Sequence, residues 1–155
     1  MHIVRSYADA KALEDREVGV SDWVVVDQER IDRFADATGD HQWIHVDADR
    51  AARELPDGKT IAHGYLTLSL IPALTGNFVR FENLRQTINF GCNKLRFYTP
   101  VIAGSRVRAR AVVRQVRQRA GALHIISEVR IEVEGERKAA CVAETIGMYF
   151  LKNAG

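Results

Sequence analysis

The helix around which this fold is built is predicted by the run His63-Gly64-Tyr65-Leu66-Thr67-Leu68-Ser69-Leu70-Ile71-Pro72-Ala73-Leu74. The run is apolar on nearly every side of a helix, and a helix of that kind is buried all round. A buried helix needs another layer of secondary structure to cover it. The run therefore predicts a central helix enclosed by a sheet.

Four segments after this helix are predicted to be the strands of the sheet. They cover residues 84–98, 105–119, 122–134 and 137–151. Apolar and charged residues alternate along the middle two segments, so each of these strands has one buried and one solvent-facing side. Short turns at Ala120-Gly121 and Gly135-Glu136 join neighbouring strands, and Gly91 predicts a bulge. The prediction is an α+β fold, a single domain over residues 1–155, whose curved antiparallel sheet wraps a central apolar helix.

Capping signals predict three further helices in the first half of the chain. Their N-caps are Ser6 with Asp9, Asp27, and Asp47, and they cover residues 6–13, 27–39 and 48–53. Gly39 suits the left-handed residue that ends the second of them. Residues 40–46 are therefore expected to form a connection between two helices, after a short strand at 23–26.

This connection carries the candidate chemistry, in Gly39-Asp40-His41-Gln42-Trp43-Ile44-His45-Val46-Asp47. Asp40 and His45 place a carboxylate and an imidazole five positions apart, shortly before the helix that begins at His63. Acid/base groups beside a helix N-terminus suit proton transfer with stabilisation of an oxyanion. Asp40 as an ordinary turn residue and His45 as a histidine bonded to backbone remain alternatives.

Gly64 is costly in the first turn of a helix, by about 1 kcal/mol relative to alanine. Such a glycine marks a close approach of the backbone to something else. One interpretation is contact with a neighbouring strand. The other is that its free N–H points at a carbonyl oxygen of a ligand.

A metal site is not predicted, although His41, His45 and His63 include a His-x-x-x-His spacing. That spacing binds zinc only when both residues share one helical face, and Gly39 has just ended the helix. Cys92 and Cys141 lack C-x-x-C spacing and fit reduced thiols in the cytosol.

Composition and charge narrow the expected partners and location of the protein. The 155 residues carry 22 basic and 20 acidic side chains. The resulting net charge of +2 is too small to attract a polyanion strongly. The N-terminal residues lack the apolar core of a signal peptide, and polar residues interrupt the longest apolar run. We expect a cytoplasmic protein that binds neither nucleic acid nor membrane.

Three motifs resemble those of the MaoC-like dehydratases, which are R-specific enoyl-CoA hydratases of hotdog fold. The motifs are Phe34 to Asp47, Thr60 to Leu68, and Asn93 to Val101 with Gly104. The sequence Gly-Asp-His-Gln-Trp-Ile-His is similar to the corresponding sequence of the NodN-like branch of this family. The resemblance runs from about Val18 to Leu151.

The resemblance implies addition of water to trans-2-enoyl-CoA, giving (R)-3-hydroxyacyl-CoA. It implies that Asp40 and His45 hold and activate one water and that the Gly64 amide receives the thioester oxygen. It also implies a homodimer with no cofactor, coenzyme A being part of the substrate. Residues expected to contact substrate are Gln42, Trp43, His63, Asn93, Lys94 and Arg96.

Two departures from the family pattern stand out. Many members carry Asn-Pro where this chain has Gln42-Trp43, and short-chain members have a serine hydroxyl where this chain has Pro72. Two other functions stay open: a hotdog acyl-CoA thioesterase, and a non-catalytic acyl-binding or dimerisation module.

Overall fold

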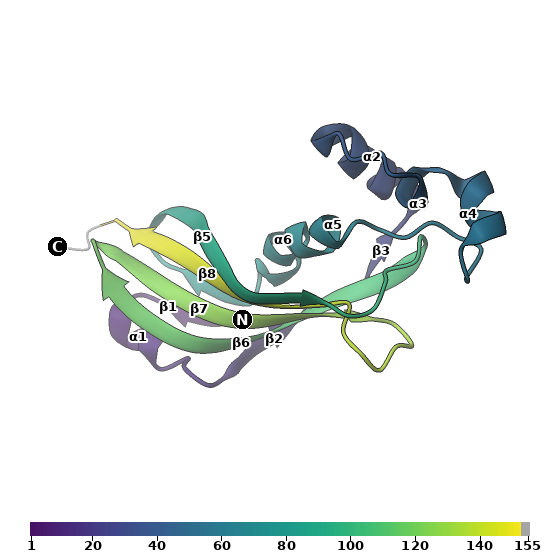
Figure 1. Cartoon of the computed structure of the whole chain (residues 1–155). Coiled ribbons are helices and arrows are strands. Elements are labelled where there is room, and N and C mark those ends of the chain that lie inside the picture. Colours follow the sequence, from purple (N-terminus) through teal and green to yellow (C-terminus); the bar gives the residue numbers. More distant parts are fainter. Residues whose placement is uncertain (153–155) are drawn as a thin grey trace.

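The computed structural model describes residues 1–152 and is dominated by one curved sheet (Figure 1). The strand order is β2-β6-β7-β8-β5, with β3 also paired to β6, and every pairing is antiparallel. The strands are β2 (Glu17–Val20), β3 (Val24–Val26), β5 (Leu84–Phe97), β6 (Ser105–Arg119), β7 (Ala122–Val133) and β8 (Cys141–Leu151). The predicted α+β class and curved antiparallel sheet are confirmed. Residues 153–155 of the predicted domain lie outside the described residues.

The predicted caps of the first three helices are confirmed, and the helices are α1 (Tyr7–Lys11), α2 (Gln28–Thr38) and α4 (Ala48–Glu54). Ser6 and Asp9 form the reciprocal capping box, while Asp27 and Asp47 each accept an N–H three residues later. The connection before α4 was expected to be irregular. It instead contains a single helical turn, α3 (Trp43–Val46), closed by the Asp47 N–H on the Trp43 carbonyl.

The central helix differs from its prediction in two ways. It is divided at Leu70 into α5 (Gly64–Ser69) and α6 (Ile71–Thr75), and Pro72, which has no N–H, lies in the first turn of α6. It is also buried on one side rather than all round. Leu66 packs into the core, whereas Tyr65 is 68% exposed, because the sheet covers one face of the helix.

The core lies between this helix pair and the concave face of the sheet. Its fully buried side chains include Ile31, Val107, Val116 and Ile131. On the opposite face Arg108 and Arg110 both bind Glu132, at 2.6 and 2.9 Å, as expected for arginines that pair across strands. Within residues 1–152, no helix is long and apolar enough to cross a bilayer.

Three further comparisons with the predictions concern the strands. The bulge predicted at Gly91 is confirmed by a register shift between Asn89 and Gly91. The last strand begins at Cys141 rather than at residue 137. A separate parallel pair, β1 (His2–Val4) with β4 (Val79–Phe81), was not predicted, because residues so distant in sequence leave no local sign of their pairing.

Candidate active site

Asp40, His45 and His63 converge, with one potential ligand atom from each lying within 4.8 Å of the others. Local structure places all three. Gly39 ends α2 with a left-handed φ of 78° and turns the chain at Asp40. The single turn α3 carries His45, and His63 directly precedes α5. The expectation that Asp40 and His45 lie together at the start of the central helix therefore holds.

His45 is 7% exposed, and its Nδ1 lies 2.6 Å from the Ile61 carbonyl oxygen. A carbonyl only accepts, so Nδ1 carries the proton and Nε2 keeps its lone pair. Burial lowers the pKa of His45 below its ordinary value, with a smaller contribution from His63, while the Ile61 bond and Asp40 oppose the shift. His45 is therefore a neutral imidazole with a free acceptor nitrogen.

His63 is 3% exposed and stacks on His45, with 3.8 Å between ring centroids and 26° between ring planes. Its Nε2 donates to the Asp40 carbonyl oxygen at 2.9 Å, and the Phe34 ring lies 4.9 Å away. Nδ1 of His63 has no hydrogen-bond partner among residues 1–152. His63 thus contacts both candidate catalytic residues, one through its ring face and the other through its edge.

These three side chains also have the composition of a metal site. A ligated metal lies in the plane of each imidazole that binds it, and the rings of His45 and His63 stack in nearly parallel planes. Their lone pairs therefore do not meet at one tetrahedral centre. His41 lies apart from them, exposed and bound to Asp36 at 2.8 Å.

A partly buried polar network holds α3 in place. Gln28 Nε2 donates to the His45 carbonyl oxygen at 2.8 Å, and the Thr60 hydroxyl donates to Gln28 Oε1. Ile61 N–H donates to the Ile44 carbonyl at 3.0 Å. Sequence reasoning missed Gln28, Thr60 and Ile61, because these contacts join residues 16 to 32 positions apart without a local motif.

Gly64 makes the close approach that its position predicted. A Cβ added there would lie 3.1 Å from two ring carbons of Phe97, on β5. The strand interpretation of this glycine is therefore confirmed. The second interpretation, an amide that meets a ligand oxygen, stays a prediction.

The remaining predicted substrate contacts divide into two groups. Gln42 and Trp43 lie between Asp40 and His45 in the sequence: the backbone N of Gln42 donates to Asp40 Oδ1 at 3.3 Å, and the Arg50 guanidinium lies 4.0 Å from the centroid of the Trp43 ring. The other group, on β5, makes its polar contacts elsewhere. Asn93 and Lys94 bind Glu144, and Arg96 binds the Leu95 carbonyl. Within the described chain, no polar contact joins this second group to the cluster.

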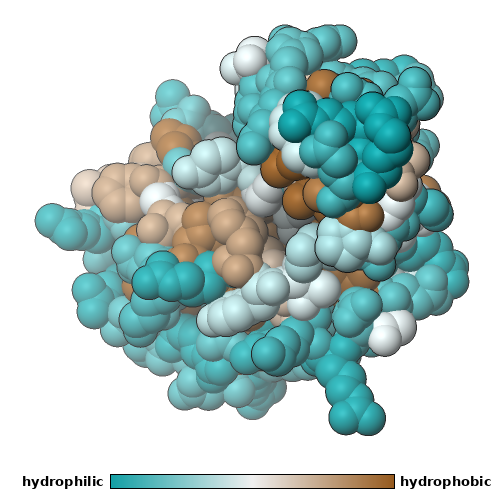
Figure 2. All heavy atoms as spheres, turned by 45° about the vertical axis from the view of Figure 1, so that its right-hand side comes forward, coloured by the Kyte–Doolittle hydropathy of each residue, from teal (hydrophilic) through white to brown (hydrophobic). Residues whose placement is uncertain are grey.

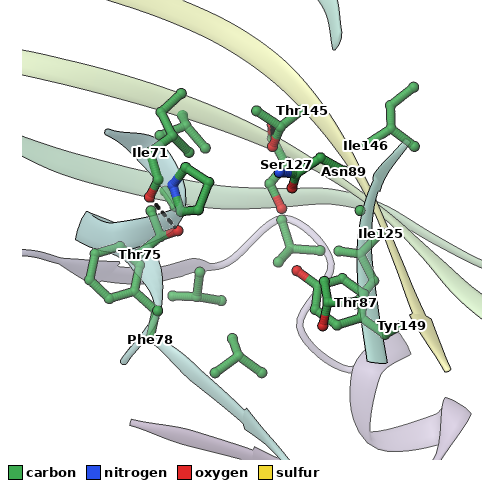
Figure 3. A pocket seen from close by; sticks show the side chains of 18 of the residues that line it. Ile71, Thr75, Phe78, Thr87, Asn89, Ile125, Ser127, Thr145, Ile146 and Tyr149 are labelled. Atoms are coloured by element: carbon green, nitrogen blue, oxygen red, sulfur yellow. Dashed lines mark hydrogen bonds between the residues drawn. The ribbon is translucent and has the colours of Figure 1, made fainter. Parts of the chain in front are cut away.

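A cavity of about 920 Å³ lies between α5, α6, β4 and the concave face of the sheet (Figure 3). Leu68 and Ser69 line it, four and five residues after Gly64, so it starts about 6 to 8 Å along the helix from that glycine. The surface view in Figure 2 shows apolar side chains gathered in a hollow of the molecule. The cavity therefore lies near the cluster of Asp40, His45 and His63.

The family model described as MaoC like domain matches residues 9–135. The chain belongs to the MaoC-like dehydratase family. Among the MaoC-like proteins, 3-hydroxyacyl-thioester dehydratase Z of Mycobacterium tuberculosis is 47% identical over 150 residues, covering 96% of this chain and 99% of that protein. Nodulation protein N of Rhizobium leguminosarum bv. viciae is 45% identical over 145 residues, covering 91% and 89%.

A solved MaoC-like neighbour has the same architecture. R-hydratase PhaJ1 from Pseudomonas aeruginosa superposes with a TM-score of 0.71 over 94% of this chain and 86% of its own, at 23% identity. At that identity the likeness shows the fold alone. The hotdog fold implied by the three motifs is confirmed.

Proposed function

We propose that this MaoC-like protein is an R-specific enoyl-CoA hydratase, which adds water to trans-2-enoyl-CoA and removes it in the reverse direction. The observation that carries the proposal is the neutral His45, whose free Nε2 belongs to a ring within reach of Asp40 at the start of α5. The name of the similar 3-hydroxyacyl-thioester dehydratase Z supports the same reaction class.

Hydration of a conjugated thioester needs a base for the water, an acid for the α-carbon and donors for the thioester oxygen. One water held between Asp40 and His45 supplies the hydroxyl to the β-carbon and a proton to the α-carbon on the same face. We assign the acid and base roles jointly to the two residues, because in this scheme both hold the same water. The Gly64 N–H donates a hydrogen bond to the thioester oxygen and stabilises the negative charge that develops on it.

His63 acts as a positioning residue in this scheme. Its ring face fixes the plane of His45 and its Nε2–H holds the Asp40 backbone, so the separation of the two catalytic groups depends on it. The acyl chain extends from Gly64 along α5 into the cavity. Gln42, Trp43, Asn93, Lys94 and Arg96 remain the proposed contacts to the rest of the substrate, in a cytoplasmic homodimer without a cofactor.

The decisive experiment follows the absorbance of the enoyl thioester in crotonyl-CoA and a longer homologue. We expect absorbance to fall without release of free thiol, and chiral analysis to give the (R)-3-hydroxyacyl product. Release of thiol from a saturated acyl-CoA would instead make the protein a thioesterase. If neither reaction occurs, the remaining alternative is a non-catalytic acyl-binding or dimerisation module.

A further inference from the structure

The wall of the cavity formed by the sheet is unusually polar for the inner face of a sheet. The register places Thr87 opposite Tyr149, Asn89 opposite Gly147, and Cys92 opposite Thr145, which in turn lies opposite Ser127. Side chains of directly opposed residues share one face. Three adjacent rows therefore present polar groups to the cavity, and Figure 3 shows Asn89, Ser127 and Thr145 together on this wall.

The Tyr149 side chain lies over Gly147, so its hydroxyl joins the middle row, in which Asn89 lies opposite Gly147. A Cβ at Gly147 would lie 2.8 Å from Tyr149 Cε2 and 3.1 Å from its hydroxyl oxygen, so the Tyr149 ring lies across the glycine. Phe81 stacks on that ring at 4.2 Å and holds it there. Burial raises the pKa of Tyr149, which keeps the hydroxyl protonated and able to donate. The hydroxyl consequently lies in the same row as the Asn89 amide.

These groups keep most of their hydrogen-bonding capacity free. The Thr145 hydroxyl donates to the Ser127 carbonyl at 3.3 Å. Within residues 1–152, the side chains of Thr87, Asn89 and Ser127 and the Tyr149 hydroxyl make no further hydrogen bond. None of them is sealed away from the cavity, since the buried orphan atoms are on His63 and His124. A plain alkyl chain packed here would remove their water without replacement, which weakens binding for each group left unsatisfied.

We propose that the cavity selects acyl groups that carry an oxygen substituent along the chain, a hydroxyl or a keto group, over plain alkyl chains. The Tyr149 hydroxyl donates to this oxygen, and the Asn89 amide donates to it or accepts from its hydroxyl. The apolar wall formed by Leu68, Ile71 and Pro72 packs against the hydrocarbon. The proposal rests on the proposed function for its thioester substrate, and it adds the chemistry of the acyl chain.

The test is calorimetric binding of saturated acyl-CoA esters, which needs no turnover. Decanoyl-CoA is compared with its mid-chain hydroxy, mid-chain keto and ω-hydroxy analogues. We expect at least one oxygenated ester to bind about 10-fold more tightly than decanoyl-CoA, the value of one net hydrogen bond. Y149F and N89L should each reduce this ratio to near one.

T75V is the matched control. Thr75 lines the same cavity, but its hydroxyl is already bonded to the Ile71 carbonyl at 2.9 Å, so the ratio should stay at the parental value. Thermal melting verifies that each variant is folded. Equal or tighter binding of decanoyl-CoA, binding of no ester, or a ratio unchanged in both Y149F and N89L would overturn the proposal.

The two proposals fail separately. A protein that prefers the oxygenated ester yet hydrates no enoyl-CoA keeps the acyl preference and loses the hydratase assignment. A protein that hydrates enoyl-CoA and binds decanoyl-CoA as tightly as its hydroxy analogues loses the preference alone.

Discussion

His45 and His63 are both buried and stack face to face, but their hydrogen bonds give them different roles. Each donates one ring N–H to a carbonyl oxygen, His45 to Ile61 and His63 to Asp40. These bonds fix one tautomer in each ring, and burial disfavours a charge on His45. The free nitrogen of His45 belongs to the proposed catalytic pair, whereas that of His63 is enclosed by protein.

Replacing either member of the proposed catalytic pair should lower hydration by at least about 100-fold, because each change removes a proton-transfer partner. The variants are D40A and H45A, with initial rates measured on crotonyl-CoA. H41A is the matched control: this histidine is exposed, one residue from Asp40, and bound to Asp36. A D40A or H45A protein with near-parental turnover would remove that residue from the chemistry.

The pH profile gives a second readout of His45. Burial holds the pKa of His45 below the ordinary value of 6.5, so the neutral ring predominates at that pH. We expect kcat/KM to fall to half of its plateau value only below pH 6.5. Stability changes in the same direction: the unfolded chain binds the proton more readily, so the free energy of unfolding also decreases below pH 6.5. A half-maximal point above pH 6.5 would contradict the assignment.

Gly64 allows its two interpretations to be separated by a pair of substitutions. G64A and G64P both place a Cβ against Phe97, but G64P alone removes the N–H. If the amide holds the thioester oxygen, turnover should fall about 100-fold further in G64P than in G64A, equivalent to about 3 kcal/mol. Melting curves establish that both proteins are folded. Equal turnover in the two variants would place the oxyanion donor elsewhere.

At the scale of elements, local signals predicted the helices well and distant contacts poorly. Ser6, Asp27 and Gly39 act within a few residues, so the ends of α1 and α2 could be inferred from their neighbours alone. The single turn α3 has no side-chain cap and depends on Gln28 and Thr60, which belong to other segments. The cluster's residues were predictable from their types, but the tautomer and plane of His45 were not.

T60V tests how far α3 depends on this network. The substitution leaves the Gln28 side-chain carbonyl without its donor in a partly buried site, so we expect a loss of about 1 kcal/mol in the free energy of unfolding. T38V removes an exposed hydroxyl at the end of α2 and should change stability by less than about 0.5 kcal/mol. Urea denaturation measures both. Equal stability of T60V and the parent would show that α3 stands without the network.

At the scale of the whole molecule, the edge strand β5 is the surface least suited to water. Ile88, Phe90 and Phe97 on it are all exposed, with Phe90 60% exposed, and Tyr65 of α5 is exposed nearby, 6.2 Å from the Phe97 ring. An apolar edge strand pairs readily with another chain. The expected homodimer provides that partner by joining two such edges.

F90K should therefore convert the dimer into monomer, because a charge on a strand edge opposes pairing. V25K is the control, since Val25 is 46% exposed on β3, away from β5. Sedimentation at micromolar concentration distinguishes the species, with circular dichroism to verify folding. A parental protein that sediments as a monomer, or a dimeric F90K protein, would count against pairing through β5.

The small parallel sheet of β1 and β4 has a consequence for motion. It has two strands of three residues each, and two-stranded pairs are only marginally stable by themselves. Val79 and Phe81 of β4 also line the cavity. This wall should therefore unfold locally while the long ladder of β6 and β7 stays closed, so backbone amides of β4 should exchange with deuterium much faster than those of β7. Equal protection of the two strands would mean that the cavity opens only when the whole protein unfolds.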